Sequence, residues 1–385
     1  MKKLAIVTTH PIQYYAPVFK LLHERNQIAI KVYYTWGEKA LDKYDHGFRQ
    51  KVTWDIPLLN GYSFEWVFNT SPDPGTHHFK GIVNPNLTKR INAWQPDAVL
   101  FFGWAYYGHL KAIKYFKNKL PIFFRGDSTL LDETAGIKSL LKTIYLRWVY
   151  KQVDHAFYVG SNNKEYFKKY GLKDSQLSFA PHAIDNDRFA EDRNAEATLL
   201  RKNLGISNDK ILILFAGKLE NKKSPVLLLS AFRALNEPNI HLLFIGNGVL
   251  ENELKTLAGN TANVHFMPFQ NQMTMPAVYQ ATDLFCLPSQ GPGETWGLAV
   301  NEALACGKAV LVSDKAGCAI DLVKEDHNGA IFKNGQLDDL IIKLKKLINS
   351  KVKLQEYGHN SKVIILGWNF QKIAEAIEKK LNETI

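Results

Sequence analysis

The sequence holds few cysteines, and their placement excludes two classes of protein. Three occur among 385 residues, at positions 286, 306 and 318. Their number is odd and no pair has C-x-x-C spacing, so we expect neither a disulfide framework nor a zinc site. We interpret all three as small buried hydrophobic residues in a protein that folds in a reducing compartment.

Long apolar runs are also missing. No stretch approaches the roughly eighteen apolar residues that a membrane-spanning helix needs. The chain starts with MKKLAIVTTHPIQYY, which is basic and then apolar like a signal peptide. Its apolar run is only LAIV, and no small-residue cleavage site follows, so we predict a buried first strand and a cytoplasmic protein.

Positive charge is in excess and is concentrated in one part of the chain. The formal net charge is +11, which indicates an anionic partner. Residues 101–180 hold 13 Lys and Arg against 6 Asp and Glu. A helix predicted over 137–153 mixes basic residues with Leu, Ile, Trp and Tyr, and segment 111–119 adds four lysines. Two interpretations remain open: an anionic membrane surface bound through 111–119 and 137–153, or a core helix with a solvated basic face.

Short apolar runs alternate with helical patterns along both halves of the chain. This alternation predicts parallel α/β layers, arranged as two doubly wound domains. Residues 186–209 are polar and show no strand pattern, so we interpret them as a linker. We expect a first domain over 1–185, a second over 186–367 and a terminal helix over 368–385. Ligands of such domains bind at the carboxyl ends of the strands.

The strongest motif is LPSQGPGETWGLAVNEALACGKAVLVSD, over residues 287–314. A strand is predicted to end near Ser289, and a glycine-containing loop then leads to a helix that opens near Gly297. Free N–H groups at a helix start bind anions, and the glycine lets a phosphate approach. Glu302 can accept hydrogen bonds from vicinal hydroxyls, and Glu294 can meet the group bonded to the phosphate. Either carboxylate alone could merely cap the helix, but the two together favour a binding site.

A second motif is FAGKLENKKSP, over residues 215–225. A buried strand ends at Gly217, and Lys218 emerges at its carboxyl end. Lys222 and Lys223 follow in the next loop, where lysines can neutralise a diphosphate. Ordinary surface lysines remain the alternative, more plausible for Lys222 than for Lys218.

These motifs together resemble the retaining glycosyltransferases of family 4. The resemblance includes GKL at 217–219, IGNG at 245–248, the E-x7-E pair of Glu294 and Glu302, and HNGAIF at 327–332. PHAIDNDRF at 181–189 is similar to a segment that precedes the family's linker. The resemblance implies a GT-B fold, with two Rossmann-like domains facing a cleft and a terminal helix that crosses back to the first domain.

The resemblance also implies roles for particular residues. Lys218 and Lys223 would hold the diphosphate, Glu302 the ribose, and Glu294 the hydroxyls of the donor sugar. The donor would be a nucleotide-diphosphate sugar, acting as co-substrate with no other cofactor and no metal. The acceptor would be a glycan or lipid-linked hydroxyl. The remaining expected donor contacts are Gly217, Thr295, Trp296, Gly297 and Leu298.

The sequence departs from the family pattern in several places. The family usually has Arg where Lys218 stands, and its early glycine pair is replaced by HPIQYY at 10–15. The family's donor-contacting histidine falls near Asp127, which could steady positive charge at the reacting carbon or simply cap a turn. The candidates for the acceptor side follow the first strand: His10, Gln13 and Tyr14.

Three other patterns imitate functional motifs. Asp185 and Asp187 copy a metal-binding D-x-D, but their position in the linker favours a turn. His77 and His78 have no acidic or cysteine partner at useful spacing, so we expect them to be exposed and metal-free. The RGD at 125–127 follows a predicted buried strand and is not interpreted as an adhesion tag.

Other functions remain open from sequence. A nucleotide-sugar epimerase or a phosphorylase could use the same scaffold, and so could a catalytically inactive sugar-nucleotide sensor. A basic nucleic-acid-binding protein is a further alternative, but the sequence shows no recognisable nucleic-acid-binding motif. We therefore expect a transferase and no nucleic-acid partner.

Overall fold

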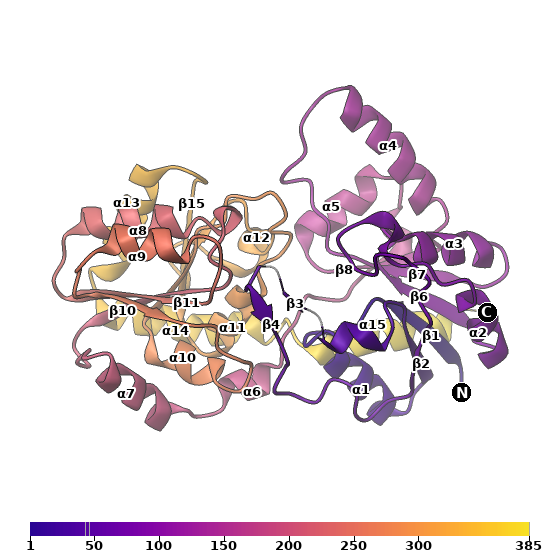
Figure 1. The fold of residues 1–385 in the computed structure, drawn as a ribbon, viewed down its shortest axis with the longest axis horizontal. Coiled ribbons are helices and arrows are strands. Elements are labelled where there is room, and N and C mark those ends of the chain that lie inside the picture. Colours follow the sequence, from indigo (N-terminus) through magenta and orange to yellow (C-terminus); the bar gives the residue numbers. More distant parts are fainter. Residues whose placement is uncertain (43, 46, 385) are drawn as a thin grey trace. The chain divides into compact units, whose positions relative to one another are not determined.

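The computed structural model describes residues 1–42, 44–45 and 47–384. By its contacts the chain divides into two compact units, each built on a parallel sheet (Figure 1). The predicted α/β class is thereby confirmed. Unit 1 comprises Met1–Lys43, Ile56–Pro181 and Phe370–Ile385, and unit 2 comprises Tyr44–Asp55 and His182–Asn369.

Unit 1 contains a seven-stranded sheet in the order β5-β2-β1-β6-β7-β8-β9. Every neighbouring pair is parallel; in the register of β1, Leu4 lies opposite Ile30 of β2 and Ala98 of β6. β1, β6 and β7 are continuous apolar runs because a parallel sheet is covered on both faces. The strands are Lys3–Thr8 (β1), Ala29–Tyr34 (β2), Phe64–Trp66 (β5), Ala98–Phe102 (β6), Ile122–Arg125 (β7), His155–Tyr158 (β8) and Leu177–Phe179 (β9).

Six helices of unit 1 connect or cover these strands. The last of them, α15, packs against α1, and the guanidinium of Arg25 pairs with the Glu378 carboxylate at 2.8 Å. Residues 370–383 therefore belong to unit 1 although they end the sequence. The helices are Ala16–Arg25 (α1), Leu87–Trp94 (α2), Tyr107–Phe116 (α3), Ile137–Tyr150 (α4), Ser161–Lys169 (α5) and Phe370–Glu383 (α15).

Unit 2 contains a six-stranded parallel sheet in the order β12-β11-β10-β13-β14-β15. Its strands are Ile211–Ala216 (β10), Ile240–Ile245 (β11), Val264–Met267 (β12), Leu284–Leu287 (β13), Ala309–Ser313 (β14) and Gly329–Phe332 (β15). A two-stranded antiparallel ribbon, Tyr44–Asp45 (β3) and Gln50–Lys51 (β4), also belongs to this unit. The larger helices are Pro225–Leu235 (α8), Glu251–Ala258 (α9), Met275–Ala281 (α10), Leu298–Ala305 (α11), Leu337–Ile348 (α13) and Lys351–Ile365 (α14).

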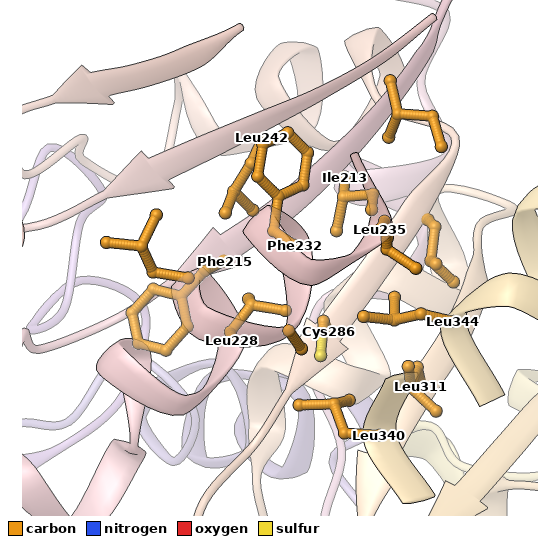
Figure 2. Close-up of a cluster of buried hydrophobic side chains, with 14 of the residues drawn as sticks. Ile213, Phe215, Leu228, Phe232, Leu235, Leu242, Cys286, Leu311, Leu340 and Leu344 are labelled. Carbon is orange, nitrogen blue, oxygen red and sulfur yellow. The ribbon is translucent and has the colours of Figure 1, made fainter. Parts of the chain in front are cut away.

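The core of unit 2 forms between its sheet and the helices α8 and α13. Figure 2 shows Leu228, Phe232 and Leu235 of α8 beside apolar side chains from four strands. Cys286 is among these buried side chains. All three cysteines are free and buried, and burial raises the pKa of the Cys286 thiol. This agrees with their interpretation as small hydrophobic residues.

The segment predicted as a linker is folded. Residues 186–209 include two helices, Asn186–Ala190 (α6) and Asn194–Asn203 (α7), and no strand, as the sequence indicated. The Asp185 carboxylate accepts a hydrogen bond from the Arg188 N–H and caps α6. Asp185 and Asp187, which resemble a metal-binding D-x-D motif in sequence, therefore lie at the start of a helix. The chain divides at 181 rather than at the predicted 185, and 44–55 lies in unit 2, where the sequence placed it in the first domain.

Within the described residues, no helix combines the length and the apolar character needed to cross a bilayer.

Two buried histidines in unit 1 should make stability depend on pH. Burial lowers the pKa of His109 and of His155 to about 4, from an ordinary value near 6.5. Between pH 6.5 and 4 the unfolded chain binds more protons than the folded one, so stability falls as pH falls. We expect each histidine to cost about 2 kcal/mol at pH 5. Urea unfolding at pH 7 and pH 5 measures this, and His109→Gln should reduce the difference; equal midpoints at both pH values would refute the assignment.

Candidate functional site

The two motifs singled out from sequence meet at one edge of the unit 2 sheet. In chain order, β11 and β12 are added on one side of β10, and β13 is then added on its other side. Such a reversal leaves a crevice at the carboxyl ends of the two central strands. The loops that follow β10 and β13 are joined there, because Gln290 donates its backbone N–H to Lys222 O and its amide to Asn221 O, both at 2.8 Å.

Glu294 lies at the centre of this edge. Its side chain is 8% exposed, and Oε2 accepts a hydrogen bond from the fully buried Ser289 hydroxyl at 2.8 Å. The ammonium of Lys223 donates to the same oxygen. The structure therefore brings Lys223 and Glu294 into direct contact. Ser289 was not assigned a role from sequence, although it lies in the strongest motif.

The start of α11 has the geometry expected from the sequence. Gly297 precedes Leu298, the first helical residue, with a φ of 100°. A Cβ at this position would lie 2.8 Å from the Leu287 side chain, so both the backbone conformation and the space require glycine. The loop before it is fixed by backbone hydrogen bonds from Gly317 N–H to Glu294 O and from Cys318 N–H to Trp296 O, both 3.0 Å long.

Glu302 projects from α11 and is 5% exposed. The hydroxyl of Tyr279, from α10, donates to Glu302 Oε2 at 2.8 Å. The indole of Trp296, another predicted donor contact, is buried within unit 2. The indole N–H donates to Asn301 Oδ1 at 2.8 Å, and the ring packs 5.1 Å from that of Trp368. The Trp296 side chain therefore packs the unit and leaves only backbone for a ligand.

Lys218 emerges after β10 as predicted, and its partner was not foreseen. Its ammonium lies 2.8 Å from Asp45 Oδ1 and over the ring of Phe48. Asp45 also accepts hydrogen bonds from the backbone N–H groups of Gly47 and Phe48. Burial opposes ionisation of Asp45, but Lys218 and these N–H groups outweigh it and lower the pKa of the carboxyl. No local pattern joins Asp45 to Lys218, because 173 positions separate them.

Gly217, a predicted donor contact, lies in close contact with Gly246 beside Lys218. It has a φ of 150°, and a Cβ on Gly246 would lie 2.0 Å from its carbonyl oxygen. The ends of β10 and β11 therefore approach more closely than side chains would allow. This contact explains why the two glycine-containing segments GKL and IGNG both appear in the sequence.

The remaining candidates lie in unit 1, at the carboxyl ends of β1 and β7. His10 Nδ1 is 2.8 Å from the Thr9 hydroxyl, and its ring contacts Trp36 edge-on. Gln13 and Tyr14 are partly buried in the segment that leads into α1. Asp127 follows β7 and is also partly buried.

Arg125 of the RGD sequence is buried within unit 1. Its guanidinium donates to Ala180 O at 2.6 Å and to Pro181 O at 2.8 Å. Burial lowers the pKa of Arg125 to about 10, against the opposing charges of Tyr15 and Asp127. An arginine in this position is structural, which supports the decision not to interpret RGD as an adhesion tag.

One expectation about metal ligands was wrong. His77 and His78 do have an acidic partner, because Asp73 lies next to both imidazoles. These three residues form a group that could hold a metal ion. The predicted exposure is correct for His77, which is 62% exposed, whereas His78 is 36% exposed.

The sequence of unit 2 matches a known family model. Residues 196–363 match the model described as Glycosyl transferases group 1. Over 199 residues the chain is 27% identical to the D-inositol 3-phosphate glycosyltransferase of Rhodococcus erythropolis, which covers 49% of this chain and 44% of that relative. The chain thus spans less than half the length of this curated relative. The stretch that matches the family model, 196–363, contains Lys218, Lys223, Glu294 and Glu302.

Solved structures match the whole chain. Sucrose-phosphate synthase from Thermosynechococcus elongatus is 14% identical with a TM-score of 0.74, over 100% of this chain and 99% of that chain. Anabaena HepE in complex with UDP is 18% identical with a TM-score of 0.73, over 99% of this chain and 100% of that chain. Likeness at this level of identity shows the fold, and the predicted GT-B fold is confirmed.

Proposed function

We propose that this protein is a retaining glycosyltransferase of family 4 that uses a nucleotide-diphosphate sugar, with uridine or guanosine as the base. It transfers the sugar to a hydroxyl of a glycan or lipid-linked acceptor, in the synthesis of bacterial surface polysaccharide or glycoconjugates. The observation that carries this proposal is the joined loop pair in unit 2, where Lys223, Glu294 and the start of α11 converge. The family match of residues 196–363 supports it.

In this proposal the residues of the donor site stabilise the negative charge that develops on the diphosphate, and they hold the sugar and the ribose. Lys218, Lys223 and the free N–H groups at Leu298 take up the negative charge of the departing diphosphate. Glu294 accepts hydrogen bonds from donor-sugar hydroxyls, and Glu302 accepts them from the ribose. Two lysines and a helix start neutralise the diphosphate, so the transfer proceeds without a metal.

Retention follows from attack on the face that the diphosphate leaves. The acceptor oxygen forms a bond to the anomeric carbon as the bond from that carbon to the phosphate oxygen breaks. The acceptor proton passes to the leaving phosphate oxygen. In unit 1, we assign acceptor contacts to His10, Gln13 and Tyr14, and we assign Asp127 to the positive charge that develops on the sugar.

Asp45 and the diphosphate of the donor would compete for the ammonium of Lys218. The Asp45 carboxylate already forms an ion pair with the Lys218 ammonium. A diphosphate that binds Lys218 therefore has to displace this carboxylate. Ion pairs that solvent can reach contribute little to stability, about 1 kcal/mol or less, so replacing this pair costs little. The pair with Asp45 holds the Lys218 ammonium in position before the donor arrives.

A lipid-linked acceptor would require the protein to work at a membrane surface. We place the protein in the cytoplasm, with the basic helix α4 and segment 111–119 resting on the inner face of the cell membrane. A lipid-linked acceptor would be presented at this surface.

Thermal unfolding with a panel of UDP-, GDP- and ADP-sugars tests the donor site. A ligand at 100 times its Kd stabilises its binding unit by about 2.7 kcal/mol. We expect one nucleotide class to raise the unfolding temperature, and Glu302→Ala to lose that response. Glu253→Ala, an exposed carboxylate of α9, is the matched control and should respond like wild type.

The products of the same reactions separate the alternatives. With a stabilising donor and an acceptor mixture, NMR of the new linkage should show the donor's anomeric configuration. Conversion of the donor without acceptor would indicate an epimerase, and a requirement for free phosphate would indicate a phosphorylase. If no nucleotide-sugar stabilises the protein, the transferase proposal is wrong.

A further inference from the structure

The loop that follows β5 in unit 1 gathers three metal-ligating side chains at one point. Asp73 Oδ2 lies 3.0 Å from His77 Nε2 and 3.3 Å from His78 Nε2. One ligand atom from each residue falls within 4.8 Å of the other two. From this geometry we propose that Asp73, His77 and His78 form a binding site for a divalent transition metal of the Zn²⁺ class.

The spacing suits a metal without movement of the backbone. Zn²⁺ binds imidazole nitrogen and carboxylate oxygen at about 2.0–2.2 Å, which in a tetrahedron places neighbouring ligand atoms about 3.4 Å apart. The two measured separations lie close to that edge length. Rotation of the side chains alone therefore converts the present hydrogen bonds into metal bonds.

The loop is held in this shape by a partly buried hydrogen-bond network centred on the side chain of Asn69. The Asn69 side chain accepts hydrogen bonds from the N–H groups of Ser71 and Val83 and donates to Gly81 O. Gly75 N–H also donates to Gly81 O, at 3.1 Å. Such bridging fixes both ends of the loop, so little conformational entropy is lost when the ligands close on an ion.

Glycines at 75 and 81 allow the loop to pack closely on itself, and Gly75 lies under the His77 ring. A Cβ on Gly75 would lie 2.5 Å from His77 Nδ1, and a Cβ on Gly81 would lie 2.2 Å from Gly75 O. Glycine at both positions allows the chain to fold back on itself and the imidazole to lie over residue 75. The His77 imidazole can therefore face Asp73 and His78 at the same time.

The donor set decides which metals fit. Two imidazole nitrogens and one carboxylate oxygen favour Zn²⁺, Co²⁺ or Ni²⁺ over Mg²⁺ and Ca²⁺, which prefer oxygen. Asp73 is 70% exposed and His77 is 62% exposed, so the remaining coordination positions face solvent and are open to water. An open three-ligand site binds less tightly than a closed structural site.

Metal binding would also stabilise the surrounding part of unit 1. The ring of Phe79 packs edge-on against Tyr107, the first residue of α3, with centroids 6.0 Å apart. A bridge across 73–78 therefore fixes a loop that already contacts α3. The metal site lies in unit 1 and shares no residue with the proposed donor site. A test of metal binding is therefore independent of the transferase proposal.

Calorimetric titration of ZnCl₂ into the full chain tests the site. The protein should carry no polyhistidine tag and be stripped with a chelator that is then removed. We expect one Zn²⁺ per chain at pH 7.5, with affinity on the order of micromolar. Co²⁺ should give visible absorption bands of an imidazole-containing site, and Mg²⁺ should show no heat.

Two variants and a matched control decide whether the binding is at this loop. Asp73→Asn and His78→Ala should each weaken Zn²⁺ binding about tenfold or more, with unchanged circular dichroism. The control is His241→Ala, which breaks the other close histidine pair, His241 and His265, at 3.0 Å in unit 2. Stoichiometry near zero, wild-type affinity in both loop variants, or loss of binding only in the control would each overturn the proposal.

Discussion

Replacing Lys223 with alanine should lower kcat by about 10²–10³-fold. Lys223 is the cation in direct contact with Glu294, at the edge where the loops after β10 and β13 are joined. If the diphosphate leaves against this ammonium, its loss removes charge stabilisation that is strongest in the transition state. The effect should therefore fall on kcat more than on KM. Steady-state kinetics with the stabilising nucleotide-sugar measure both.

The neighbouring lysine provides a matched control. Lys222 carries the same charge one residue earlier, but its ammonium lies 3.4 Å from Glu220 and it is half-exposed. Lys222→Ala should keep near wild-type kinetics, because only its backbone oxygen contributes to the joined loops.

A second variant distinguishes a loss of catalysis from a loss of stability. Lys223→Ala leaves the buried Glu294 carboxylate without its cation, so the variant's unfolding temperature has to be compared with that of wild type. Lys223→Arg keeps the charge and should recover part of the activity. Wild-type kcat in a folded Lys223→Ala protein would show that this lysine does not meet the diphosphate.

The geometry of the candidate site in unit 2 could be predicted from sequence because its signals are local. Gly297, Glu302 and the strand before them lie within one strand-loop-helix unit, so their spacing along the chain fixes their spacing in the fold. The same holds for Gly217 and Lys218 at the end of β10. Apolar runs of four to six residues also marked the central strands, since these are buried on both faces.

The features that sequence missed depend on contacts between distant residues or on loop shape. Asp45 reaches Lys218 across 173 positions. Asp73 meets His78 through a fold of the loop that requires glycines at 75 and 81, and no regular period describes such a loop. Edge strands such as Phe64–Trp66 are short and mixed in polarity, so their sequence resembles a loop. The burial of the Trp296 indole against Asn301 and Trp368 could not be predicted either, because proximity to a motif does not show which way a side chain points.

The helix α4 should bind vesicles that contain anionic lipid, and loss of its apolar stripe should abolish that binding. Its large apolar side chains at 137, 140, 141, 144, 145 and 148 are between 37% and 80% exposed. These positions follow the i, i+3, i+4 spacing of one helical face. The opposite face packs into unit 1 through Leu146, Val149 and Tyr150. A stripe of this size on a monomer marks an interaction surface.

The charge of the helix favours an anionic bilayer as the occupant. Residues 137–150 contain three basic residues and no acidic ones, and Lys151 follows directly. Each basic residue near an anionic surface contributes about 1 kcal/mol, and burial of apolar side chains adds to this. Lys114 of helix α3 lies over the Trp148 ring, and Lys119, which follows α3, lies over the Tyr115 ring, so segment 111–119 places further charge beside aromatic rings. Binding should therefore weaken as salt concentration rises.

Sedimentation with vesicles of phosphatidylcholine, with and without phosphatidylglycerol, measures the effect. The triple variant Leu140→Gln, Leu141→Gln and Ile144→Gln keeps helix propensity and removes apolar area that is already exposed, so folding should be unchanged. We expect its vesicle affinity to fall at least tenfold, whereas Ile342→Gln, an equally exposed isoleucine on α13, should bind like wild type. Equal sedimentation with neutral and anionic vesicles would remove the electrostatic part of the argument. A stable dimer that the triple variant dissolves would identify a second copy of the chain, and not a membrane, as the partner of this face.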